Sequence, residues 1–109
     1  MQITHERVGD SIVVHIQDEM GHHEARRILD YLENIVVLYP VEPVVLDLSG
    51  LTFMDSSGLA VAMNLHRALA RTGRSLVIRG TPPQAMRVFR AAGLPHRMTF
   101  VDEKGEKQC

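Results

Sequence analysis

The segment Val44-Val45-Leu46-Asp47-Leu48 constrains the fold of this chain more than any other part of the sequence. It is a nearly continuous apolar run, with Pro43 before it and Ser49-Gly50 after it. A short run of this composition is typical of a central strand that is covered on both faces. The segment therefore predicts a sheet with other elements packed against it.

Upstream of this run, the sequence predicts a hairpin and then a helix. Apolar residues alternate with others over 12–16, which is the period of a strand, and Gly9-Asp10 predicts a turn from a short opening strand at 2–7. A helix fits residues 22–38 and ends before Pro40. Its apolar positions recur every three or four residues and form one face: Ala25, Ile28, Leu29, Leu32, Ile35, Val36 and Tyr39.

Downstream of the run, Ser49-Gly50 predicts a turn, and residues 51–54 lead extended into a second helix. This helix is expected to end near Arg71, before the terminator Gly73. Its predicted inner face consists of Leu59, Ala62, Met63, His66, Leu69 and Ala70.

The last third of the chain predicts a strand, a helix and a short final strand. The strand covers 75–79, and the helix follows with Thr81 as its cap and Pro82 at its first position. The predicted inner positions of this helix are Ala85, Met86, Phe89 and Ala92, with Gly93 as its stop. A strand at 98–101 completes the order β-β-α-β-α-β-α-β, which is that of a single α/β domain with a mixed sheet. Residues 1–101 form this domain, and the charged residues 102–109 are expected to be a loose tail.

Composition excludes several classes of function. The 109 residues carry 12 basic and 13 acidic side chains, so no basic surface for nucleic acid is expected. No apolar run approaches the roughly 20 residues of a membrane span, and the N-terminus lacks an apolar signal segment. The single cysteine, Cys109, cannot form an internal disulfide. The chain is expected to be cytoplasmic, without contacts to nucleic acid or membrane.

The segment Met54-Asp55-Ser56-Ser57-Gly58 is the candidate functional site, because it joins a strand to a helix. The first turn of a helix has free backbone N–H groups and the positive end of the helix dipole. Asp55, Ser56 or Ser57 can cap those donors, which is a purely structural explanation for all three residues. The glutamate of a capping box is missing.

The same geometry also allows a regulatory role. A hydroxyl at this position projects from the carboxyl edge of the sheet, where α/β proteins tend to place binding sites. Phosphorylation there adds a charge of about −1.5 to −2 beside Asp55. Such a charge can repel a docked partner without unfolding the domain, and the small Gly58 permits close approach by another protein.

The sequence resembles the bacterial anti-sigma factor antagonists, which are STAS domains. The resemblance rests on Leu46-Asp47-Leu48 followed by the segment 51–59, Leu-Thr-Phe-Met-Asp-Ser-Ser-Gly-Leu. The order of elements agrees from about Gln2 to Val101, and Gly21-His22-His23-Glu24-Ala25 resembles the sporulation branch.

The resemblance implies a phosphorylation switch. Ser56 matches the serine that the partner anti-sigma factor, itself a serine kinase, phosphorylates. The unphosphorylated antagonist binds the nucleotide-bound anti-sigma factor and frees the sigma factor, and a serine phosphatase resets the switch. The implied partner-binding residues are Asp55, Ser57, Gly58, His22, His23 and Glu24. The antagonist itself catalyses nothing and needs no cofactor.

One segment departs from the family pattern. The family often has glycine, an acidic residue, an apolar residue and aspartate before the first helix, whereas this chain has Asp18-Glu19-Met20-Gly21. Both the glycine and the final aspartate are replaced. The usual ionic contact of this loop with a partner is therefore in question, and Glu19 or Glu24 are the available substitutes.

Other chemistries have weaker support in the sequence. Neighbouring helical residues point about 100° apart, so His22, His23 and Glu24 do not form a zinc-site pattern. His66 fits a half-buried structural histidine better than a catalytic base. No hydrolase nucleophile motif surrounds Ser56, and no phosphate-binding loop ends in Gly-Lys-Ser/Thr.

Two alternatives to the phosphorylation switch stay open. In the first, the chain is a constitutive STAS scaffold or carrier subunit of a sensory or transport assembly, and Ser56 is only a cap. In the second, which has the least support, Asp55 or Ser56 is an enzyme nucleophile.

Overall fold

The computed structural model describes residues 2–108. The strands are β1 (Ile3–Val8), β2 (Ser11–Met20), β3 (Val44–Met54), β4 (Leu76–Arg79) and β5 (Thr99–Val101). The helices are α1 (Ala25–Leu38), α2 (Ser56–Ala70) and α3 (Pro83–Ala91), with a short 3-10 helix, η1 (Leu94–His96), before β5. This order confirms the predicted α/β domain.

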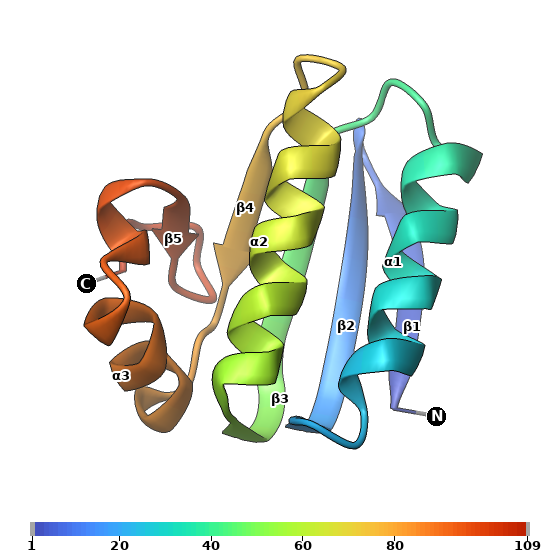
Figure 1. The fold of residues 1–109 in the computed structure, drawn as a ribbon. Coiled ribbons are helices and arrows are strands. Elements are labelled where there is room, and N and C mark those ends of the chain that lie inside the picture. Colours follow the sequence, from blue (N-terminus) through green and yellow to red (C-terminus); the bar gives the residue numbers. More distant parts are fainter. Residues whose placement is uncertain (1, 109) are drawn as a thin grey trace.

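The five strands form one mixed sheet in the order β1-β2-β3-β4-β5. β1 pairs antiparallel with β2, and the remaining pairs are parallel. Helices α1 and α2 lie side by side across one face of the sheet, and α3 lies at the side of β4 and β5 (Figure 1). The crossover through α1 makes β2 and β3 parallel, so their carboxyl ends lie at the same edge of the sheet.

An aliphatic core fills the space between the sheet and the helices. Val44, Leu46 and Leu48 of the predicted central strand are fully buried, and Ile28, Leu32 and Ile35 are the buried residues of α1. The predicted apolar face of α1 is thus confirmed.

The buried face of α2 is rotated about the helix axis relative to the predicted inner face. The buried residues of α2 are Gly58, Val61, Ala62, Leu65 and Leu69, whereas the predicted Ala70 is exposed and Leu59, Met63 and His66 are half-buried. α2 packs against α1 and approaches α3 as well as the sheet, so apolar residues occupy most of its circumference and do not mark one face.

The predicted turn at Ser49-Gly50 was wrong, because β3 continues through both residues to Met54. β2 is also longer than predicted and pairs with this extension as far as Met20↔Met54, with two register irregularities on the way. The partner strand supplies the backbone hydrogen bonds that make an extended Ser-Gly pair stable.

Several helix ends also differ from the predictions. α1 begins at Ala25, because residues 22–24 form a turn. α3 has Pro82 at its N-cap position and no side-chain cap, so the Thr81 hydroxyl does not cap it. The predicted inner residue Ala92 is exposed beyond the end of α3.

Residues 102–108 fold back onto β5, in contrast to the expected loose tail. Lys107 forms an antiparallel bridge with Val101, and the Gln108 N–H donates to the Phe100 carbonyl at 2.9 Å. The Gln108 side-chain amide also pairs with the backbone of Thr81. Backbone pairing, which charge composition does not reveal, holds this segment on the sheet.

None of the helices within residues 2–108 combines the length and apolar character needed to cross a membrane.

Candidate functional site

The predicted site lies where β3 ends and α2 begins, next to the end of β2. Asp55 is the N-cap of α2 and has an extended backbone. Its Oδ1 accepts a hydrogen bond from the Ser57 backbone N–H at 2.8 Å. Its own carbonyl accepts from the N–H groups of Gly58 and Leu59 at 3.1 and 3.3 Å. Asp55 therefore satisfies the first turn of α2.

Asp55 also ties the loop before α1 to this helix end. Its Oδ2 accepts a hydrogen bond from the His22 backbone N–H at 3.1 Å. In the same loop, Glu24 Oε1 accepts from the Gly21 N–H at 3.2 Å. One carboxylate thus joins two segments that are 33 residues apart in the chain.

These contacts set the charge state of Asp55. Burial raises the pKa of the Asp55 carboxyl, but hydrogen bonds from the backbone N–H groups of Ser57 and His22 outweigh burial and hold the pKa below its ordinary value. A nearby His22 side chain lowers the pKa further. Asp55 is therefore a carboxylate at neutral pH.

Ser56 differs from Asp55 because its side chain neither caps the helix nor links segments of the fold. It is exposed as the first residue of α2, and no hydrogen bond within residues 2–108 involves its hydroxyl. Of the three residues that the sequence offered as caps, the structure assigns the cap to Asp55. Ser57 is half-buried and contributes its backbone N–H.

Gly58 is buried, and its missing side chain serves packing inside the domain. A Cβ at this position would lie 2.4 Å from the Met20 carbonyl oxygen and 2.5 Å from Met54 Cγ. The missing side chain therefore lets α2 approach the ends of β2 and β3 within the same molecule.

The structure brings His22, His23 and Glu24 close to Asp55 through the loop before α1. His22 and His23 are exposed, and their rings meet edge-on with centroids 5.6 Å apart. Within residues 2–108, no group of three or more His, Cys, Asp or Glu side chains is arranged to hold a metal ion. Ser56 and the two histidines are thus exposed, and Asp55, which holds their two segments together, is half-buried.

Two features of the site were missed in the sequence. Gln84, on α3, accepts from the Met54 N–H at 2.9 Å and donates to the Met54 carbonyl at 2.8 Å, so its amide substitutes for a neighbouring strand. No local signal marks a contact over 30 residues. Phe53, beside the site, is 43% exposed, although the apolar pattern gave no sign of this.

The departure at Asp18 has a visible consequence. Asp18 has a φ of 70°, the left-handed region, at an irregularity in the pairing of β2 with β3. Its carbonyl accepts a hydrogen bond from Thr52 Oγ1 at 2.6 Å. A glycine adopts this backbone conformation without steric cost, whereas Asp18 holds it with strain.

Comparison with known proteins agrees with this architecture. Residues 2–106 match the model of the STAS domain. The chain belongs to the STAS domain family. The match continues past Val101 into the segment that folds back onto β5.

Proteins similar to this STAS domain include named antagonists. The Anti-sigma F factor antagonist of Paenibacillus polymyxa is 26% identical over 104 residues, which are 95% of this chain and 89% of that protein. The Anti-sigma-B factor antagonist of Listeria monocytogenes is 30% identical over 104 residues, which are 93% of this chain and 88% of that protein. The structure of the Bacillus cell fate determinant SpoIIAA in its phosphorylated form is similar in fold, with a TM-score of 0.72, 23% identity and coverage of 94% and 93% of the two chains.

Proposed function

We propose that this STAS domain is an anti-sigma factor antagonist whose binding is switched by phosphorylation of Ser56. The unphosphorylated form binds a nucleotide-bound anti-sigma factor in the cytoplasm, and the sigma factor is released. The anti-sigma factor is a serine kinase that phosphorylates Ser56 and then dissociates. A serine phosphatase restores the binding form. The names of the similar Paenibacillus and Listeria proteins support an antagonist role.

The observation that carries the proposal is that Asp55 caps the helix while the neighbouring Ser56 hydroxyl stays exposed. Asp55 caps α2 and holds the loop before α1, and among residues 2–108 no group hydrogen-bonds to the Ser56 hydroxyl. That hydroxyl is exposed and available to a kinase. A residue that is needed neither for capping nor for packing is free to change its charge without unfolding the domain.

The local charges make phosphorylation a strong signal. Phosphoserine carries about −1.5 to −2 charges at neutral pH. The N–H groups of Ser57, Gly58 and Leu59 already donate to Asp55, so they are not available to neutralise a phosphate on Ser56. The new charge would stand beside the Asp55 carboxylate at the exposed end of α2. A partner docked on this end with an apolar or acidic surface would be repelled.

The neighbouring residues supply the rest of the proposed docking surface. His22 and His23 lie on the loop that Asp55 holds, and Phe53, two residues before Asp55, offers an exposed ring at the end of β3. Aromatic side chains are common anchors of protein interfaces. Glu24 and Gly58 act inside the domain, where they position this surface.

Incubation with ATP and each anti-sigma factor of the same genome tests the proposal, with intact mass and site mapping as the readout. We expect one added phosphate on Ser56. Ser56→Ala should take no phosphate and should bind the anti-sigma factor persistently. Ser75→Ala, at an exposed serine before β4 and outside the proposed docking surface, is the matched control and should be phosphorylated like the natural chain.

Two outcomes would contradict the proposal. The first is the absence of phosphate on Ser56 with every anti-sigma factor. The second is equal affinity of the anti-sigma factor for the phosphorylated and unphosphorylated chains in calorimetry. Co-purification with a large sensory or transport assembly, unchanged by Ser56→Ala, would instead identify a constitutive scaffold or carrier.

A further inference from the structure

A cavity of about 280 Å³, here called the α2 cavity, lies between the second half of α2 and the segment that begins with η1. It shares no residue with the Ser56 site, which lies at the other end of α2. Its volume is near the lower end of the range for small-molecule pockets, about 300–1,000 Å³. The α2 cavity can therefore accept a compact ligand, and its lining decides which kind.

The larger part of this lining is apolar. Leu94 and Met98 belong to the core and are only 2% and 8% exposed, and Met63 of α2 is half-buried. Ala70 also lines the cavity, and its short side chain leaves space there that a longer one would fill. A hollow with such a surface favours an apolar group over water.

The polar part of the lining consists of His66, Arg67 and Arg97, without any carboxylate. The two arginines give it a formal charge of +2 at neutral pH, whereas the whole chain carries −1. Neither arginine takes part in a salt bridge within residues 2–108. Arg67 Nη1 donates to Asn64 Oδ1 at the long distance of 3.5 Å, and no side-chain hydrogen bond among the described residues involves His66 or Arg97. These donors are therefore available to an anion.

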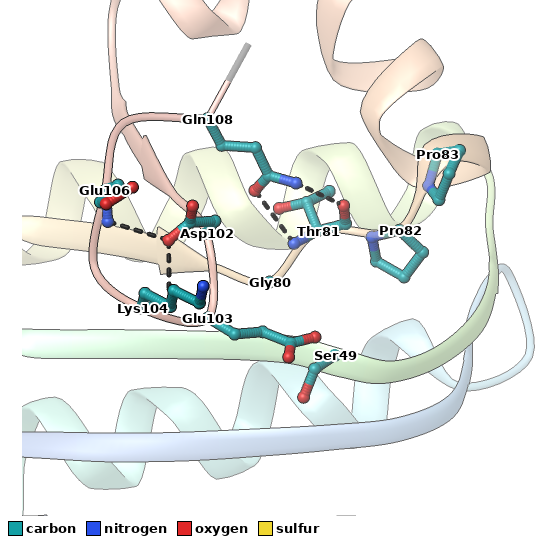
Figure 2. A pocket seen from close by; sticks show the side chains of 10 residues that line it. All are labelled: Ser49, Gly80, Thr81, Pro82, Pro83, Asp102, Glu103, Lys104, Glu106 and Gln108. Carbon is teal, nitrogen blue, oxygen red and sulfur yellow. Dashed lines mark hydrogen bonds between the residues drawn. The ribbon is translucent and has the colours of Figure 1, made fainter.

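Basic residues do not line every hollow of this domain. The depression beside the turn at residues 102–106 has three carboxylates in its wall, those of Asp102, Glu103 and Glu106, against the single ammonium group of Lys104 (Figure 2). An anion is therefore attracted to the α2 cavity and repelled from this acidic depression. The contrast provides an internal reference for a binding experiment.

We propose that the α2 cavity binds a small organic anion, a carboxylate on a short apolar chain or ring, with Arg67 and Arg97 as its ionic partners. Guanidinium groups bind carboxylates through short, charge-assisted hydrogen bonds. Both arginines are exposed and have long side chains, so their guanidinium groups can reach a carboxylate at the mouth of the cavity. The apolar part of the ligand then lies on Leu94 and Met98. Inorganic phosphate gains nothing from these apolar residues and is the poorer ligand.

Titration of the full-length ¹⁵N-labelled protein at pH 7 and low salt tests the proposal, with octanoate, octanol and octylammonium as probes that differ only in the head group. We expect octanoate to shift the amide signals of Arg67, Ala70 and Met98 together. The signals of Gly80 and Glu103, at the acidic depression, should stay unchanged. Octanol should bind about tenfold more weakly, because it loses two partly exposed ion pairs, and octylammonium should not shift the α2 cavity signals. From butanoate to octanoate, each added methylene that is buried should strengthen binding about fourfold.

Three variants separate a specific site from general attraction. Arg97→Gln should weaken octanoate binding about three- to fivefold, as for loss of a partly exposed ion pair. Arg26→Gln removes the same charge from an exposed position of α1 and should leave the affinity unchanged. Ala70→Leu should fill the cavity and abolish binding. Because leucine is nearly as good a helix former at this exposed position, the thermal midpoint should change by less than about 3 °C.

Several results would overturn the proposal. In the first, octanoate shifts none of the α2 cavity signals at about 10 mM, beyond the millimolar affinity of weak specific ligands. In the second, octanol binds as tightly as octanoate, so the arginines contribute nothing. In the third, Arg26→Gln weakens binding as much as Arg97→Gln does, or Ala70→Leu leaves binding unchanged. If N-acetyl-glutamate amide bound more tightly than octanoate, the cavity would take an acidic side chain of a partner protein, and a free organic anion would be the wrong ligand.

Discussion

Replacement of Gly58 by alanine should destabilise the domain by about 2 kcal/mol, although alanine is the better helix former. The added Cβ would stand 2.4 Å from the Met20 carbonyl oxygen and 2.5 Å from Met54 Cγ. Both distances are far below an ordinary carbon contact of about 3.5–4.0 Å. The substitution therefore forces α2 away from the ends of β2 and β3.

The size of this effect follows from two opposing contributions. Alanine in place of glycine inside a helix gains about 1 kcal/mol. Overpacking of a filled core costs typically about 1–3 kcal/mol, and more when the site cannot relax. Met20 contributes a backbone atom in the last pair of the β2–β3 ladder, so it cannot rotate away as a side chain does. The overpacking cost therefore lies at or above the top of its range and exceeds the gain.

Urea denaturation followed by circular dichroism measures the loss of stability, and the thermal midpoint should fall by about 10 °C for 2 kcal/mol in a domain of this size. Ser57→Ala, in the same turn of α2, is the control and should change the free energy of unfolding by less than about 0.5 kcal/mol. A Gly58→Ala variant as stable as the natural chain would refute the packing argument. If that variant also lost affinity for the anti-sigma factor, Gly58 would be a docking residue after all.

Three further predictions concern charged groups of the domain. Asp55→Ala should cost about 1 kcal/mol of stability at pH 7, because it removes the cap of α2. Folding lowers the pKa of Asp55, so this stabilisation is fully present above the unfolded-state pKa of about 3.9 and is lost as the pH falls through the folded-state pKa. The urea denaturation curves of the variant and the natural chain should therefore converge in acid. Asp18→Gly should stabilise the domain by up to about 1 kcal/mol in thermal melts, because glycine relieves the left-handed conformation at this position, whereas Asp18→Val should destabilise it. Arg79→Met should cost about 1–3 kcal/mol at pH 7, because it leaves the buried Asp47 carboxylate without its 2.7 Å ion pair. Burial raises the pKa of Asp47, but hydrogen bonds from Arg79 and Ser49 outweigh burial and keep that pKa low. The stability lost in Arg79→Met should therefore become smaller as Asp47 is protonated in acid. A loss of stability that stays the same at low pH would refute the ion pair as its cause.

Much of the architecture follows from local patterns in the sequence. The apolar run at 44–48 became the buried central strand, and the three- and four-residue spacing from Ile28 to Ile35 became the buried face of α1. The junction at 54–58 became a strand end followed by a helix. Each of these signals lies within one element, where side-chain period and burial are directly linked.

The sequence by itself determined the family, the order of elements and the position of the candidate switch residue. The tertiary structure decided which site residues cap, which pack and which stay exposed, because contacts between distant segments of the chain fix these roles. The hydrogen bond from His22 to Asp55 and the close approach of Met20 to Gly58 give these residues structural roles. The Ser56 hydroxyl has no hydrogen bond within the described residues 2–108. The continuation of β3 through Ser49-Gly50 likewise depended on β2, since an extended backbone needs a neighbouring strand for its hydrogen bonds.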